Sequence, residues 1–169
     1  MIHISDTIGP WVPFFKTILK NLEELGLPTQ LKCDHICYRV ETLKRYEQMK
    51  LELSPFGIFF QEKKINHRMI SVLKLHRPLE CSGHHIDCIE LPAPKKNNRH
   101  IEGLEHAKFI YHHISKMTSL YPHIEFDLSG SSRKKNQELT LQMSEHSRVK
   151  FHPLSIQDII KIDSASQDE

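Results

Sequence analysis

The chain has 169 residues, of which 38% are hydrophobic and 26% charged, a composition typical of a globular protein with one domain. Its formal charge of +2 is too small to predict nucleic-acid binding, and the basic runs at 95–99 and 133–135 are typical of solvated loops. We find no apolar stretch long enough to span a membrane and no signal peptide, and four cysteines are too few for a disulfide framework. We therefore expect a cytoplasmic protein. Thirteen histidines are the one compositional excess, and histidine is the commonest metal ligand.

The first half of the chain predicts a helix, a strand, a second helix and three further strands. Apolar residues at three- and four-residue steps predict an amphipathic helix over 13–26. A strand follows at 33–40, and Thr42 is a favourable first residue for a helix that ends near 54–55. A loop is predicted over 78–83. The three further strands are predicted at 56–62, 70–75 and 84–91.

The second half predicts the same order of elements, which indicates a duplicated module. A strand at 104–111 leads into a helix at 112–120. The three strands after it are predicted at 124–128, 138–143 and 148–152. A short helix or strand at 155–162 is expected to bury its isoleucines, which are Ile156, Ile159 and Ile160. Residues 164–169 are predicted to form a disordered polar tail.

The first strand of each half presents a histidine. Successive side chains of a strand point to opposite faces, so the face that carries His35 is predicted to hold Cys33, Cys37 and Arg39. The opposite face is apolar, with Ile36, Tyr38 and Val40. In the second half His106 and Lys108 share a face in the same way. Two strands that each carry a histidine on a polar face suggest a polar site between the halves.

Four runs of the sequence, CDHICYRV (33–40), IELP (89–92), EGLEH (102–106) and KFHP (150–153), resemble the YecM family of bacterial proteins within the vicinal oxygen chelate (VOC) superfamily. The resemblance implies an α+β fold in which two βαβββ modules form a curled mixed sheet around a shared, metal-capable cavity, with an N-terminal covering helix. It implies a single domain over 1–163. Its parts are an N-terminal helical extension (1–31), a first module (32–95) and a second module (102–163).

The resemblance also implies a set of metal ligands. The superfamily places one ligand on the first strand and one on the last strand of each module, which matches His35, Glu90 and His106 here. Strand alternation independently places Glu90 on the face opposite Ile89 and Leu91. The fourth position usually holds a carboxylate, but the last strand of this chain offers only His152.

Two more kinds of residue accompany these ligands. Arg39 and Lys108 project beside the histidines, and we predict that they bind an anionic group of a substrate. The alternative is that these cations only neutralise carboxylates of the cavity. Glu102 or Glu105 is a candidate partner for the second ring nitrogen of a ligating histidine.

Two imidazoles and one carboxylate bind a divalent transition metal such as Zn, Ni, Mn, Co or Fe and leave coordination positions open. A small molecule with adjacent oxygens can then chelate the metal. The sequence therefore predicts a metal-dependent isomerase, lyase or oxygenase. The alternatives are a non-catalytic protein of the same fold that sequesters a small molecule, and an interaction protein with a vestigial cavity.

Overall fold

The computed structural model describes residues 2–96, 100–133 and 136–165. Its helices are α1 (Ile4–Ile8), α2 (Trp11–Glu24), α3 (Leu43–Leu53), the short 3-10 helix η1 (Ser54–Phe56), α4 (Ile114–Leu120) and α5 (Ile156–Ala165). Its strands are β1 (Cys33–Arg39), β2 (Gly57–Ile65), β3 (Arg68–Cys81), β4 (His84–Pro92), β5 (Gly103–Ile110), β6 (Leu139–Gln142) and β7 (Arg148–His152). Within the described residues, no helix is long and apolar enough to cross a bilayer.

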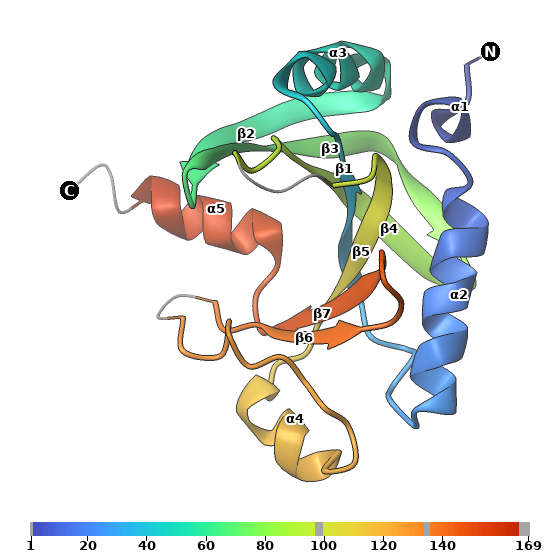
Figure 1. Ribbon diagram of the computed structural model, residues 1–169, viewed down its shortest axis with the longest axis vertical. Coiled ribbons are helices and arrows are strands. Elements are labelled where there is room, and N and C mark those ends of the chain that lie inside the picture. Colours follow the sequence, from blue (N-terminus) through green and yellow to red (C-terminus); the bar gives the residue numbers. More distant parts are fainter. Residues whose placement is uncertain (1, 97–99, 134–135, 166–169) are drawn as a thin grey trace.

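The strands form one seven-stranded mixed sheet in the order β2-β3-β4-β1-β5-β7-β6. It curls without closing, and α5 lies across the open side between the β2 end and the β6–β7 end (Figure 1). Residues of both halves and of α5 line a hollow on the concave face. At its centre β1 and β5 pair antiparallel, so that Ile36 faces Ala107. On the outer flanks, β1 pairs in parallel with β4, and β5 pairs in parallel with β7. The predicted α+β fold, with a curled mixed sheet and an N-terminal helix, is confirmed.

The N-terminal helix α2 covers the convex face of the sheet. Its residues Phe15, Ile18 and Leu22 recur at helical spacing and are fully buried against the apolar side of the central strands. The ring of Phe15 stacks 6.1 Å from that of Phe109 on β5. Each such buried aromatic or aliphatic side chain stabilises the fold by about 1.5–3 kcal/mol. Because the apolar side of β1 and β5 packs against α2, the polar side chains on their other side face the hollow.

The boundary of the first predicted helix needs correction, whereas the start of the second is confirmed. α2 begins at Trp11 and ends at Glu24, two residues ahead of the predicted bounds at each end. α3 starts after Thr42, whose side chain accepts a hydrogen bond from the backbone N–H of Arg45 at 3.0 Å.

The predicted strand at 124–128 is wrong. Within this segment only Asp127 joins the sheet, through a single bridge to Thr140. The neighbouring strand β6 has only four residues and offers little edge to pair with. Ile124 and Phe126 instead pack on the hydrophobic core, and the Phe126 ring meets Phe151 edge-on at 6.3 Å. The apolar alternation of this segment therefore reflects packing, and the second module has one strand fewer than the first.

The predicted loop at 78–83 is also wrong for most of its length. β3 continues to Cys81, and only Ser82 and Gly83, both with positive φ, make the turn into β4. Pairing of β3 with β4 breaks after Lys74 and resumes at Leu79, so Pro78 lies where its missing N–H costs no hydrogen bond.

The C-terminal segment is a helix, α5, that runs to Ala165. Its isoleucines at 156, 159 and 160 are half-buried, not buried as predicted, because they border the hollow. Residues 166–169 of the predicted tail lie outside the described part of the chain, as do 97–99 and 134–135 of the two predicted basic loops.

Replacing Gly57 with alanine should lower the free energy of unfolding by about 1–3 kcal/mol, the usual cost of overpacking. An added Cβ would collide with the backbone carbonyl of Lys74 on the adjacent strand, and this group cannot move without distorting the β2–β3 pairing. Urea unfolding followed by circular dichroism measures the change. As a control, Ile58→Ala removes a side chain that is 62% exposed and should change stability by less than about 0.5 kcal/mol. Equal unfolding midpoints for Gly57→Ala and wild type would contradict the close approach.

Candidate metal centre

Two irregularities in the β1–β5 pairing shape the centre of the concave face. Cys33 pairs with Phe109 and His35 with Lys108, so Asp34 is an extra residue on β1. Further along, Cys37 pairs with His106 and Tyr38 with Leu104, and Glu105 is an extra residue on β5. Bulges of this kind redirect side chains. Each of them places an acidic side chain beside the histidine that follows it in the sequence.

The bulge at Asp34 also corrects one predicted face. Because the extra residue shifts the alternation, Cys33 belongs to the apolar core with Ile36, whereas His35 points to the concave side. The prediction that Cys33 and His35 share a face is therefore wrong.

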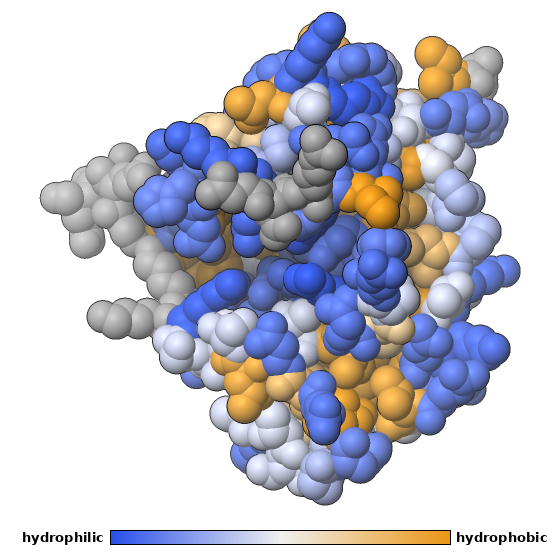
Figure 2. Space-filling model, in the orientation of Figure 1, coloured by the Kyte–Doolittle hydropathy of each residue, from blue (hydrophilic) through white to orange (hydrophobic). Residues whose placement is uncertain are grey.

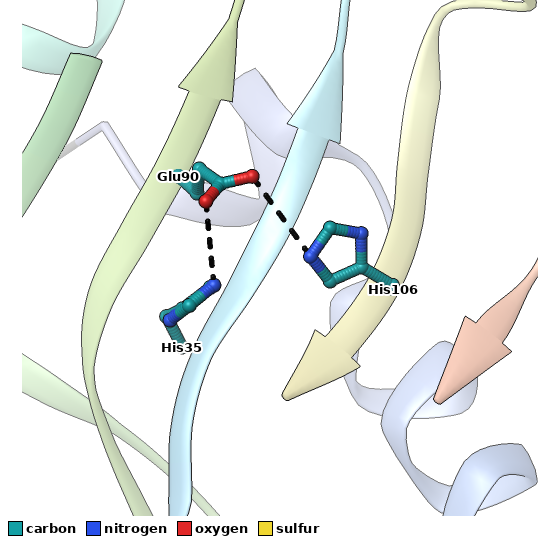
Figure 3. A group of neighbouring side chains, drawn as sticks. All are labelled: His35, Glu90 and His106. Atoms are coloured by element: carbon teal, nitrogen blue, oxygen red, sulfur yellow. Dashed lines mark ion pairs between the residues drawn. The ribbon is translucent and has the colours of Figure 1, made fainter. Parts of the chain in front are cut away.

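His35, Glu90 and His106 converge on the concave side from the three neighbouring strands β1, β4 and β5 (Figure 3). The carboxylate of Glu90 lies between the imidazoles: one oxygen is 3.6 Å from Nε2 of His35 and the other is 3.9 Å from Nε2 of His106. One potential ligand atom from each residue lies within 4.8 Å of the others. Both Nε2 atoms are buried, and neither has a hydrogen-bond partner among the residues that the structure describes.

The opposite ring nitrogens of the two histidines are held by the bulged carboxylates. Nδ1 of His35 donates to Asp34 at 2.8 Å, and Nδ1 of His106 donates to Glu105. An Nδ1–H donor leaves the lone pair on Nε2, so both lone pairs point toward Glu90. Pairs of this kind, a carboxylate behind each imidazole, are the usual support of metal-binding histidines.

The electrostatics keep the converging groups in the forms that bind metals. Burial raises the pKa of the Glu90 carboxyl, but His35, His106 and Lys108 outweigh this effect and lower the pKa to about 2. Burial and the Lys150 ammonium lower the pKa of His106 to about 4. At neutral pH Glu90 is thus ionised and His106 is neutral, as metal ligands must be.

A second group of potential ligands, Cys37, Glu105 and His106, is less suitable. Burial raises the pKa of the Cys37 thiol well above its usual value, so the thiol stays protonated, and a thiol binds metals only as the thiolate. Glu105 is already engaged by Nδ1 of His106 and by Nε of Arg39 at 3.3 Å. The group around Glu90 is therefore the better candidate.

The structure does not bring His152 into the group around Glu90. Nε2 of His152 lies 3.2 Å from Asp34, and Nδ1 accepts a hydrogen bond from Asn136 at 2.9 Å. His152 thus lies beside the Asp34 carboxylate behind His35, and its buried Nε2 makes no hydrogen bond to any described residue.

The position that corresponds to Glu90 in the second half of the sheet holds Lys150. Glu90 pairs with Cys37, two residues after His35, and Lys150 pairs with Lys108, two residues after His106. The ammonium of Lys150 lies 3.2 Å from Glu138. A cation thus stands where a fourth ligand would.

Of the two predicted substrate-binding residues, only Lys108 lines the cavity beside the group around Glu90. This cavity has a volume of about 550 Å³ and includes residues of both halves and of α5. Its walls are largely hydrophilic where the surface is hollowed, with an apolar area toward α5 (Figure 2). Arg39 lines a separate cavity of about 390 Å³ beside Glu105.

Several residues of the site were not predicted from the sequence, namely Asp34, Asn136, Glu138 and Lys150. A signal for Asp34 is present, since an acidic residue directly precedes the histidine in both halves. The predicted partner role of Glu105 agrees with its contact to Nδ1 of His106, whereas Glu102 pairs with Arg45 at 2.8 Å.

The chain as a whole is similar to known proteins. Protein YecM of Escherichia coli (strain K12) is 26% identical over 178 residues, which cover 94% of this chain and 93% of that protein. A solved structure from structural genomics, Protein EC4020, is also 26% identical, covers 95% of this chain and 96% of its own, and superposes with a TM-score of 0.77.

More distant similarity identifies the fold. Methylmalonyl-CoA epimerase of Streptomyces coelicolor, solved as a single-residue variant in complex with 2-nitronate-propionyl-CoA, has a TM-score of 0.50 at 13% identity, covering 72% of this chain and 98% of the epimerase. At this identity the likeness shows the fold alone, which is that of the VOC superfamily. The family described as YecM protein matches residues 3–163. The chain belongs to the YecM family.

Proposed function

We propose that His35, Glu90 and His106 bind one divalent transition metal ion, and that the protein acts on a small molecule that chelates this ion. The observation that carries the proposal is the pair of buried Nε2 atoms that lack hydrogen-bond partners and face one carboxylate. A buried polar atom without a partner is costly, and a metal ion would satisfy both nitrogens at once.

Two imidazoles and one carboxylate suit several metals, among them Fe, Zn, Ni, Mn and Co, and leave positions open for a ligand. A metal in such a site supplies Lewis acidity to a bound oxygen or activates bound water or dioxygen. The chain's own part is to hold the ligands in place through Asp34 and Glu105, and to offer the Lys108 ammonium to an anionic oxygen.

The reaction class that we propose is an isomerase, lyase or oxygenase. The fold supports a small-molecule ligand, because the structurally similar epimerase was solved with 2-nitronate-propionyl-CoA in complex.

A second candidate is a non-catalytic protein that sequesters the chelating molecule. It is favoured by the weakness of the available bases. Although burial raises the pKa of Glu138, the Lys108 and Lys150 ammonium groups hold it well below its usual value. Burial lowers the pKa of His152 to about 4. A group with so low a pKa abstracts a proton poorly at neutral pH, which weighs against an isomerase that relies on these residues.

Protein purified without a His tag should bind about one Ni²⁺ or Zn²⁺ ion per chain, as measured by calorimetric titration and elemental analysis. His35→Ala, Glu90→Ala and His106→Ala should each weaken binding by more than about 100-fold, because even outer-shell losses cost about 10–100-fold. His85→Ala is the matched control, since its imidazole on β4 is 65% exposed and pairs only with Glu80 among the described contacts. That variant should bind metal like the wild type.

The outcome that would refute the metal site is a His35→Ala variant that binds metal normally. Circular dichroism shows whether His35→Ala still folds. If this variant unfolds and a chelator does not change the stability of the wild type, His35 is a structural residue and the metal site is refuted.

Asp34→Asn and Glu105→Gln should each weaken metal binding by about 10–100-fold while the three ligands remain. An amide can donate to Nδ1, which would move the proton of the imidazole to Nε2 and block the lone pair. Glu80→Gln, which alters an exposed carboxylate–histidine pair, serves as the control. The same titration measures all three variants, and unchanged affinity in both Asp34→Asn and Glu105→Gln would contradict the orienting role.

A further inference from the structure

The cavity beside the group around Glu90 has two walls of different chemistry. Among the described residues, its lining includes five cationic side chains, Lys63, Arg68, Lys108, Arg133 and Lys150, and three acidic ones, Glu90, Glu138 and Asp163. The positive charge exceeds the negative charge by two before any metal ion is counted. A low-dielectric cleft lined by one sign of charge concentrates ligands of the opposite sign.

Three of the five cations lie together on the side of the cavity next to His35. Lys108 lies opposite His35 in the sheet, and Lys150 lies opposite Lys108. Lys108, Lys150 and Arg133 share a single carboxylate, that of Glu138, at 2.7, 3.2 and 3.4 Å. Glu138 and the neighbouring Glu90 carry two negative charges against these three positive ones, so this wall, which we call the cationic wall, keeps the capacity to bind an anion.

The facing wall carries the aliphatic side chains of the lining, beside the charged residues Lys63, Arg68 and Asp163. It is built by β2, β3 and α5, and its aliphatic members are Ile65, Ile70, Val72, Ile156, Ile159 and Ile160. No Phe, Tyr or Trp lines the cavity among the described residues. α5 is fixed over the cavity by the Ile156 N–H, which donates to Asp34 at 2.9 Å, and by the Lys63–Asp163 ion pair at 2.9 Å.

We infer that the cavity takes an aliphatic α-keto or α-hydroxy carboxylic acid. The acid group and its neighbouring oxygen supply the adjacent oxygens that the proposed function requires, and this inference rests on that function. The negative charge lies on the cationic wall, and the hydrocarbon chain lies against the isoleucines of α5. A volume of about 550 Å³ is within the range of pockets for small molecules.

Calorimetric titration of the full chain with three probes tests the inference, using both metal-free and Ni²⁺-loaded protein. The probes are α-ketoisocaproate, its neutral primary amide and the short acid pyruvate. We expect α-ketoisocaproate to bind at least about tenfold more tightly than its amide, because the amide lacks the charge that the lysines recognise. It should also bind at least about tenfold more tightly than pyruvate, which lacks the branched chain.

Two variants test which wall of the cavity causes which binding preference. Lys150→Met should remove the preference for the acid over the amide, and Ile160→Asn should remove the preference for α-ketoisocaproate over pyruvate. Lys150→Met leaves Glu138 paired with Lys108 and Arg133, so the variant is expected to fold. Lys64→Met is the matched control, because Lys64 is exposed and lies outside the cavity lining; it should keep both preferences.

The inference is overturned if the wild type binds the acid and the amide equally, binds none of the probes, or loses its preference in Lys64→Met as fully as in Lys150→Met. Failure of the proposed function has a different signature, namely no uptake of Ni²⁺. In that case a preference for the acid in metal-free protein, lost in Lys150→Met, would still support the inference.

Discussion

The antiparallel pairing of β1 with β5 is the constraint on which the rest of the structure depends. It joins the two halves of the chain at Ile36 and Ala107 and brings His35 and His106 onto one concave surface. The two bulges in this pairing are equally necessary. In a regular strand Asp34 and Glu105 would point to the opposite face from the histidines, into the apolar layer under α2, where an unpaired carboxylate is costly. The bulges turn both carboxylates toward the concave side, where each one holds an imidazole.

Asp34 connects this centre to the end of the chain. Its carboxylate contacts Nδ1 of His35, Nε2 of His152 and the first N–H of α5. Burial raises the pKa of this carboxyl, but the contacts with His152 and His35 hold it well below its usual value, so the group is charged when it serves all three partners. The orientation of a candidate ligand and the position of the helix that covers the cavity therefore depend on the same carboxylate oxygen, Oδ2 of Asp34.

The resemblance to the VOC superfamily, together with strand alternation around Glu90, predicts that His35, Glu90 and His106 lie close together, and the structure brings them together. The same reasoning fails where the backbone departs from a regular ladder. Cys33 is predicted on the wrong face because a single extra residue, Asp34, reverses the alternation. The segment at 124–128 alternates like a strand, but it makes a single bridge to the sheet, and Phe126 packs against Phe151. Long-range contacts of this kind, like that of Asn136 with His152, have no local signature in the sequence.

The identity of residue 150 decides the electrostatics of the site. If the position related to Glu90 held a second carboxylate, two negative charges would neutralise a divalent ion, and the centre would attract an anion only weakly. With Lys150 there, Glu90 would be the single charged ligand of the proposed site, so a bound divalent ion would keep one positive charge, and the Lys150 ammonium lies on the same wall. Coulomb attraction at such short range is strong in a partly buried cavity, where effective dielectric constants are about 20. A lysine at this position of the duplicated pattern would thus leave a coordination position open and favour an anionic chelator.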